Sequence, residues 1–195
     1  MLIEPWLGYK STWRILSLLL ETPRKPVSRT ELFKYTKLGN APLSRGLERL
    51  VNFGLLTLEK RGKKQLYFIN ERSLLIKPIR DLWSTEKDSL RNLPYEISLI
   101  LNEFIRSLNE ACHNLEQVYL FGSQAKGTAT VHSDIDLAVI FKENLKQEIS
   151  VTRIVNDLEK QFAVKIQVHF FTKSNFSAKT KLVEEIKTEG ITLLC

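Results

Sequence analysis

The chain has 195 residues, of which 43% are hydrophobic and 26% are charged, and its formal net charge is +7. This composition is ordinary for a globular protein and excludes a disordered chain, a collagen-like repeat and a disulfide-rich scaffold. The length allows one large domain or two small ones, each with a modest core. All apolar runs are shorter than the ~18 residues that a membrane span requires, so we expect no membrane partner.

The positive charge is confined to the first half of the chain. Residues 1–90 hold 17 Lys and Arg against 9 Asp and Glu, a net +8, whereas residues 91–195 hold 12 against 13, a net −1. A basic half beside a nearly neutral half predicts an N-terminal module that binds an anionic partner.

The cysteines and the first residues indicate the cellular compartment in which the protein is expected. Cys112 and Cys195 are too few to form a disulfide framework or a zinc pattern. Two lone thiols suit a reducing environment, and the first residues lack the basic and apolar regions of a secretory signal. We therefore expect a cytoplasmic protein.

The first half of the chain predicts three helices. Apolar residues at helical spacing place them at 10–21, at 29–36, and between a turn at 37–40 and Gly54. Ser28 is expected to cap the second helix, with Glu31 completing a capping box three residues later.

A basic hairpin follows these helices. Its strands are expected at 55–60 and 65–70, joined by the Arg-Gly-Lys-Lys turn at 61–64. The strands alternate apolar and polar residues, as is typical of a half-buried hairpin, with apolar positions at Leu56, Leu58, Leu66 and Phe68.

The order of helices and basic hairpin over residues 8–72 resembles the winged helix-turn-helix family of DNA-binding domains. The resemblance implies that the third helix enters the major groove of double-stranded DNA and that the hairpin, or wing, lies along its backbone. The side chains that would contact DNA are Ser44, Arg45, Arg49, Asn52, Lys60, Arg61, Lys63 and Lys64. Glu48 lies between the two arginines, and a wing used for protein contacts is the alternative.

Beyond residue 70 the chain predicts a connecting helix, with a break near Pro94. A longer helix then carries apolar residues at every third or fourth position from Ile97 to Leu115. This stripe is expected to pack under a sheet. A homodimer interface is the alternative, since two-fold symmetry suits a DNA-binding protein.

A glycine-serine turn between two apolar strands, followed by an Asp-x-Asp pair, is the most informative motif. Side chains alternate along a strand, so Asp134 and Asp136 leave the same face with Cα atoms ~7 Å apart. Two carboxylates on a rigid edge suit Mg²⁺, which shares its remaining ligands with substrate phosphates. Gly122 lets the backbone approach a phosphate, and Ser123 is expected to cap a helix whose N–H groups face that anion.

This motif, within residues 95–195, resembles the minimal nucleotidyltransferases of the polymerase-beta superfamily. The resemblance implies that Asp134 and Asp136 hold Mg²⁺ or Mn²⁺ for nucleotidyl transfer, with ATP as the expected nucleotide. The residues that would bind the nucleotide are Gly122, Ser123, Lys126 and Ser133. Minimal members of this superfamily include antibiotic-modifying enzymes and antitoxins that adenylylate a toxin. The second half is too short for a substrate domain, which favours a macromolecular acceptor such as a protein.

The family usually supplies a third carboxylate from the next strand, and here that strand, 164–171, contains no Asp or Glu. Gln167 and His169 share the corresponding face. Only His169 can accept a proton, since its unperturbed pKa lies near ~6.5, so it is the candidate catalytic base. A structural role for this histidine is the alternative.

Three functions therefore stay open. The first is nucleotidyl transfer to a macromolecule by a DNA-binding protein. The second is a transcription regulator whose second domain has lost its chemistry and senses a nucleotide or mediates assembly. The third is a nucleic-acid enzyme to which the winged helix delivers a substrate end.

The predicted fold is a two-domain α+β protein. A winged helix-turn-helix domain at 1–75 and a helical linker at 76–94 precede a nucleotidyltransferase domain at 95–195 with a small mixed sheet. The remaining elements of that last domain are expected as a helix at 147–162, a strand at 164–171, a helix at 178–188 and a strand at 190–194.

Overall fold

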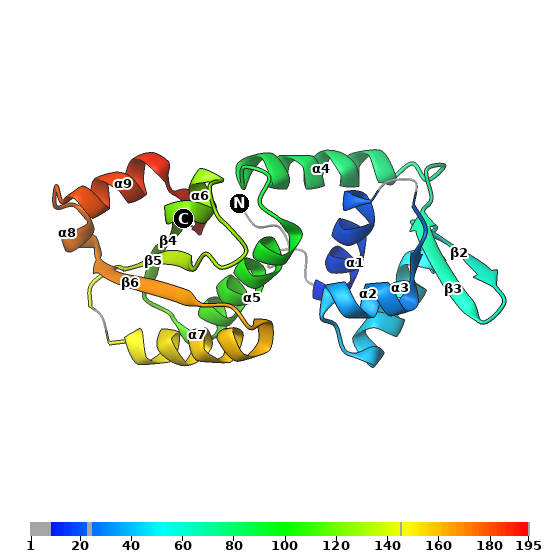
Figure 1. Cartoon of the computed structure of the whole chain (residues 1–195), viewed down its shortest axis with the longest axis horizontal. Helices are drawn as coiled ribbons and strands as arrows, with labels where there is room; N and C mark the ends of the chain where they lie inside the picture. The colour runs from blue at the N-terminus through cyan, green and yellow to red at the C-terminus, as the bar shows by residue number, and fades with distance from the viewer. Residues whose placement is uncertain (1–8, 23–24, 145, 195) are drawn as a thin grey trace. The chain divides into compact units, whose positions relative to one another are not determined.

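The computed structural model describes residues 9–22, 25–144 and 146–194. The chain divides into two compact units between Glu86 and Lys87. This division falls inside helix α4 (Ile76–Ser89), within the segment predicted to connect two domains (Figure 1). None of the described helices combines the length and the hydrophobicity that crossing a lipid bilayer requires.

The first unit contains the three predicted helices, α1 (Lys10–Glu21), α2 (Arg29–Thr36) and α3 (Asn40–Asn52). The capping box at the start of α2 is confirmed. Ser28 Oγ accepts a hydrogen bond from the Glu31 amide, while the Ser28 amide donates to the Glu31 carboxylate at 2.8 Å. These two bonds satisfy amides that the first turn of a helix leaves without partners.

The first unit also contains a three-stranded antiparallel sheet in the order β1-β3-β2. Strands β2 (Leu56–Arg61) and β3 (Lys64–Ile69) form the predicted hairpin. Strand β1 (Val27–Ser28) is too short for periodicity to predict. The hairpin turn is reduced to Gly62 and Lys63, because Arg61 already pairs with Lys64, and Gly62 adopts a φ of +59°.

The buried face of β3 differs from the one that the sequence alternation indicated. The strand register pairs Leu58 with Tyr67, so Tyr67, only 5% exposed, faces the core with Leu58. Leu66 and Phe68 therefore lie on the opposite face. The cause is the tight turn, because a one-residue change of register exchanges the two faces of a strand.

The second unit contains a four-stranded sheet in the order β6-β5-β4-β7, as the prediction of a small mixed sheet requires. Its strands are β4 (Leu115–Phe121), β5 (Ile135–Phe141), β6 (Ile166–Thr172) and β7 (Ile191–Leu194). Strand β5 is parallel to β6 and antiparallel to β4, which is itself antiparallel to β7.

One face of this sheet is covered by α5 (Tyr95–Ala111) and α7 (Glu148–Phe162), below the sheet in Figure 1. The predicted apolar stripe of α5 packs there, with Phe104 and Leu108 fully buried in the main core. The stripe is thus covered by this unit's own sheet rather than left for a dimer.

The other face carries α8 (Lys173–Phe176), which was not predicted, and α9 (Lys181–Glu189). A smaller apolar cluster here includes Phe121, Ala138 and Ile140. Asp136 shares this face with Ala138, because side chains two residues apart on a strand point the same way. The candidate site therefore lies on the α9 side of the sheet.

Candidate functional site

The predicted glycine-serine turn lies directly against the second aspartate. Helix α6 (Gly122–Lys126) begins where β4 ends, and Phe121 pairs with Asp136 across the sheet. Gly122 has a φ of +67°, and a Cβ atom at this position would overlap the Asp136 carboxylate. Only glycine satisfies both the backbone conformation and the close approach.

The prediction that Ser123 caps a helix is wrong. Helix α6 begins at Gly122 and its N-cap is Phe121, which makes no side-chain capping bond. Ser123 therefore lies two residues after the capping position, inside the first turn. Its carbonyl oxygen accepts a hydrogen bond from the Thr128 amide at 3.1 Å, which holds the following loop.

The two aspartates lie at the start of β5 with partly exposed side chains. Asp134 Oδ2 forms an ion pair with Lys165 Nζ at 3.3 Å, and the Lys165 side chain is 76% exposed. Burial raises the pKa of the Asp136 carboxyl, and the nearby charges of Asp134 and Glu185 raise it further. Asp136 thus carries a negative charge that the protein does not fully compensate.

The donor chemistry fits a divalent metal ion that is shared with a substrate. Asp134 and Asp136 offer hard oxygen ligands of the type that Mg²⁺ and Mn²⁺ prefer. Within the described ranges, no three His, Cys, Asp or Glu side chains are grouped to hold a metal ion. An ion bound by this pair would therefore need further oxygen ligands, which water and nucleotide phosphates can supply.

Strand β6 places a neutral side chain in the position nearest to Asp136. Gln167 pairs with Asp136, and His169 pairs with Ala138, one step further along the same face. The His169 ring packs edge-on against the Phe121 ring with centroids 5.4 Å apart. His169 also has a favourable charge interaction with Asp136 that lowers the pKa of this carboxyl, although burial outweighs it.

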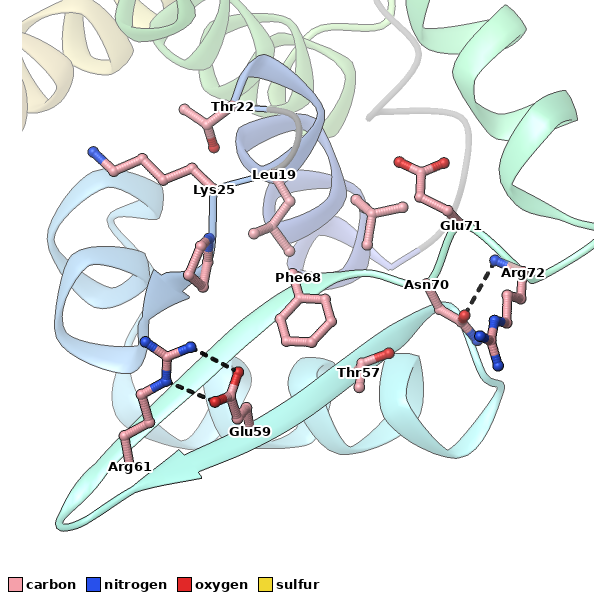
Figure 2. A pocket seen from close by; sticks show the side chains of 12 residues that line it. Leu19, Thr22, Lys25, Thr57, Glu59, Arg61, Phe68, Asn70, Glu71 and Arg72 are labelled. Carbon is pink, nitrogen blue, oxygen red and sulfur yellow. Dashed lines mark hydrogen bonds and ion pairs between the residues drawn. The ribbon is translucent and has the colours of Figure 1, made fainter.

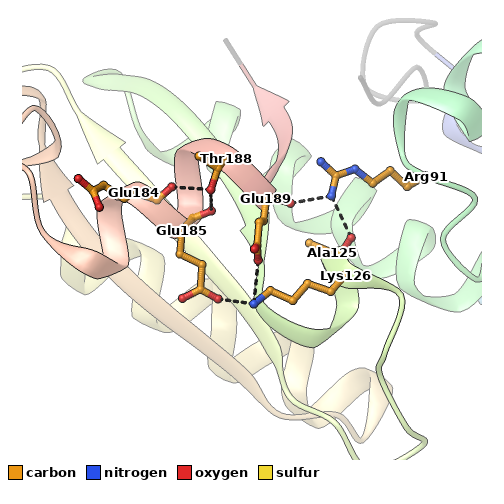
Figure 3. Close-up of polar contacts among 7 residues, drawn as sticks. All are labelled: Arg91, Ala125, Lys126, Glu184, Glu185, Thr188 and Glu189. Carbon is orange, nitrogen blue, oxygen red and sulfur yellow. Dashed lines mark hydrogen bonds and ion pairs between the residues drawn. The ribbon is translucent and has the colours of Figure 1, made fainter.

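Two other predicted nucleotide-binding residues have partners within the protein. Lys126 Nζ lies 2.7 Å from a Glu185 oxygen and 2.8 Å from a Glu189 oxygen, as Figure 3 shows. These carboxylates raise the pKa of Lys126. Ser133 Oγ accepts a hydrogen bond from the Thr130 amide at 2.8 Å, which closes the loop before the aspartates.

The structure adds residues that the sequence did not reveal. Arg91 donates hydrogen bonds to the carbonyl oxygens of Ala125, at 3.2 Å, and Glu189, at 2.7 Å, so it ties α6 to the end of α9 (Figure 3). Glu185 and Glu189 hold the same two helices together through Lys126. The sequence contains one signal for this pair: residues four positions apart lie on the same face of a helix, so both glutamates can reach one cation.

The comparison with known families agrees with this geometry. Residues 102–195 match the family described as polymerase beta, nucleotidyltransferase. This segment is a nucleotidyltransferase domain.

Similar proteins have been described. The chain is 27% identical over 99 residues to "Putative protein adenylyltransferase MJ0141" of Methanocaldococcus jannaschii, covering 49% of this chain and 97% of that protein. It is 38% identical over 64 residues to "Putative protein adenylyltransferase MJ1305" of the same organism, covering 32% and 44%. A solved toxin–antitoxin structure with AMP-PNP is 30% identical and covers 48% of this chain and 71% of that chain, with a TM-score of 0.38.

A second candidate site lies in the first unit, in the space between α2, α3 and the hairpin, where four cations and the carboxylates of Glu31 and Glu48 line two cavities. A cavity of about 770 Å³ is lined by Arg29 and by Lys60, Lys63 and Lys64 of the hairpin. An adjoining cavity of about 380 Å³ is lined by Arg29 together with Ser44, Glu48 and Asn52 of α3. Arg29 lines both cavities and donates a hydrogen bond to Ser44 Oγ at 2.9 Å. We call the two cavities together the basic groove.

Three of the residues that were predicted to bind DNA do not line the basic groove. The Arg49 guanidinium lies over the Tyr9 ring, 4.2 Å from its centroid. Arg61 is paired with Glu59 at 2.6 Å and lines a different cavity, on the other face of the hairpin. Arg45 is exposed on α3, outside both cavities of the groove. Arg29, in contrast, was missing from the predicted set.

The raised pKa of Asp136 predicts a gain in stability when its charge is removed. The folded chain holds the carboxyl proton to a higher pH than the unfolded chain does, so ionisation at neutral pH disfavours the folded state. We expect Asp136→Asn to raise the Tm of this domain at pH 7 by roughly 1–3 °C. The gain should shrink as the pH falls through the raised pKa and disappear below ~3.9, where both states are protonated.

Thermal unfolding followed by circular dichroism measures this difference. Asp157→Asn is the matched control, because Asp157 is exposed on α7, and it should leave the Tm unchanged. An Asp136→Asn variant that melts below the wild type at pH 7 would contradict the electrostatic account.

Proposed function

We propose that the nucleotidyltransferase domain binds Mg²⁺ or Mn²⁺ with a nucleoside triphosphate, expected to be ATP, and transfers the nucleoside monophosphate to a hydroxyl group of a protein. The close approach of the Asp136 carboxylate to Gly122 is the observation that supports this most strongly. It places a turn whose backbone amides would bind a phosphate next to the two metal-binding carboxylates. A protein acceptor is supported by the names of the two archaeal relatives, which describe protein adenylyltransferases.

Each residue of the candidate site has a separate role in the proposed transfer. Asp134 and Asp136 would hold the metal ion, which neutralises phosphate charge when bound. Gly122 and Ser123 would hold the phosphates through their backbone amides. The acceptor oxygen attacks the α-phosphorus, the bond to the bridging oxygen breaks, and pyrophosphate leaves. His169 is the candidate that takes the proton of the acceptor hydroxyl.

A second candidate function is nucleotide sensing without transfer, in a protein that regulates transcription. The observation in its favour is that β6 places Gln167, which cannot act as a base, beside Asp136. In this case the domain binds the nucleotide and the missing carboxylate suppresses turnover.

Slow transfer to water tests the proposal without knowledge of the acceptor. Incubation of the full chain with Mg²⁺ and ATP should yield AMP and pyrophosphate, separated by anion-exchange chromatography. Asp136→Asn should reduce this rate at least ~100-fold, since catalysis here depends on charge neutralisation. Release of ADP and phosphate, or an unchanged rate in the variant, would refute the proposed transfer. Mg²⁺-dependent ATP binding with no AMP would favour sensing.

Lys126 is proposed to exchange its carboxylate partners for phosphate when the nucleotide binds. Its ion pairs with Glu185 and Glu189 then compete with the nucleotide. The double variant Glu185→Gln, Glu189→Gln should therefore bind Mg²⁺–ATP about 5-fold more tightly, which is the scale of two partly exposed ion pairs.

Calorimetric titration measures this affinity. Glu184→Gln is the matched control, since Glu184 is an exposed neighbour on the same helix and forms no ion pair with Lys126. Unchanged ATP affinity in the double variant, together with a lowered Tm, would show instead that Lys126 serves only to hold α6 against α9.

We also propose that the first unit is a winged helix-turn-helix domain that binds double-stranded DNA through the basic groove. Support comes from Arg29, Lys60, Lys63 and Lys64, whose four positive charges outnumber the two carboxylates, Glu31 and Glu48, that also line the groove. Phosphates supply most of the affinity of such sites, while polar side chains such as Ser44 and Asn52 can reach base edges. The excess of positive charge in residues 1–90 agrees with this.

DNA binding can be tested by comparing cations at the hairpin tip that line the basic groove with one that lines the cavity on the opposite face. The double variant Lys63→Gln, Lys64→Gln should weaken binding to a DNA duplex and reduce the slope of log K against log salt by about 2, one for each lost phosphate contact. Arg61→Gln, at the same hairpin tip but paired with Glu59, should change both values little. Fluorescence anisotropy of a labelled duplex measures them. An equal loss in both variants would refute the assignment of the groove.

A further inference from the structure

The outer face of the β2–β3 hairpin carries an unexpected apolar surface. Phe68 pairs with Thr57 and points away from the core, on the face opposite Tyr67. It is only partly buried, whereas Tyr67 belongs to the core cluster of this unit. The face of the hairpin opposite the core therefore has a partly buried aromatic ring of its own.

Phe68 lies in a cavity of about 600 Å³, which Figure 2 shows from close by. Its apolar lining is completed by Leu19 of α1, Pro26 and Ile69. This volume lies within the ~300–1,000 Å³ range of sites that bind small molecules, and an apolar lining with a few polar groups is typical of such sites. None of its apolar residues belongs to the basic groove.

The charged groups around this cavity are unequally compensated. Glu59 is paired with Arg61 at 2.6 Å, and Glu71 is paired with Arg80 at 2.8 Å. Lys25 and Arg72 also line the cavity, and the described residues provide neither of their side chains with an ion pair. The two cations flank Phe68 from opposite sides in Figure 2. The rim is therefore positive around an apolar centre.

We infer that this cavity binds a small amphipathic anion, in which an apolar, preferably aromatic, body lies against Phe68 and a carboxylate faces Lys25 or Arg72. The aromatic ring of Phe68 favours an aromatic partner through stacking or edge contacts. An Arg or Lys at the edge of an apolar site strengthens the binding of an anion, because the charge pair is partly shielded from water. This site is independent of the nucleotidyltransferase chemistry and of the DNA proposal.

Titration of the ¹⁵N-labelled full chain with 1-naphthoate, followed by nuclear magnetic resonance, tests the site. Naphthalene-1-methanol is the neutral probe with the same ring system. We expect saturable shifts of the amides of Leu19, Thr57, Phe68 and Asn70, with a Kd for naphthoate below about 1 mM, the affinity typical of a ligand of this size. The neutral probe should bind at least 5-fold more weakly.

Two pairs of variants locate the binding. Thr57→Trp would fill the cavity from an exposed strand position and should weaken naphthoate binding at least 10-fold. Lys60→Trp, on the same strand but facing the basic groove, should leave it unchanged. Arg72→Gln should reduce the preference for the anionic probe, while Lys63→Gln, a loss of the same charge at the hairpin tip, should not. Amide spectra that otherwise superpose on the wild type show that each variant is folded.

The proposal is overturned if neither probe gives saturable shifts, if both bind equally, or if Thr57→Trp binds naphthoate as well as the wild type. It is also overturned if the shifts spread over many surfaces, which would indicate adsorption to exposed apolar residues. Localised shifts, anion preference and loss in Thr57→Trp together support it.

Discussion

The contact between the Asp136 carboxylate and the backbone of Gly122 determines how the nucleotidyltransferase domain is built. Gly122 directly follows β4 and Asp136 lies on the adjacent strand β5, where it pairs with Phe121. Both strands are anchored by buried residues such as Leu120 and Leu137, which are inaccessible to solvent. The distance between the proposed phosphate-binding turn and the carboxylates is therefore fixed by the sheet, as a site that works by alignment requires.

The charges around this contact favour the binding of a cation. Asp134, Asp136, Glu185 and Glu189 carry four negative charges, and the lysines paired with them, Lys126 and Lys165, carry two positive ones, which leaves a net −2. A triphosphate would be repelled by this set. A divalent ion between the aspartates and the phosphates removes the repulsion, so nucleotide and metal are expected to bind together. Burial raises the pKa of Asp136, and the neighbouring charges of Asp134 and Glu185 raise it further.

Local patterns predicted much of the fold. Most helices, the hairpin and the capping box at Ser28 follow from periodicity and short-range hydrogen bonding. The family motif led to the mixed sheet, to Gly122 and to the two aspartates. Features set by distant contacts could not be predicted. Arg91 binds Glu189 across 98 positions. The outward position of Phe68 depends on strand register, and the start of α6 at Gly122, one residue before Ser123, depends on a single backbone conformation.

Calorimetric titration of the full chain with ATP, with and without Mg²⁺, tests the central claim most directly. The account predicts one site per chain that requires Mg²⁺ and that is lost in the Asp134→Asn, Asp136→Asn double variant, while the variant keeps its fold by circular dichroism. ATP binding that is independent of Mg²⁺, or that survives in the double variant, would show that these aspartates do not form the nucleotide site.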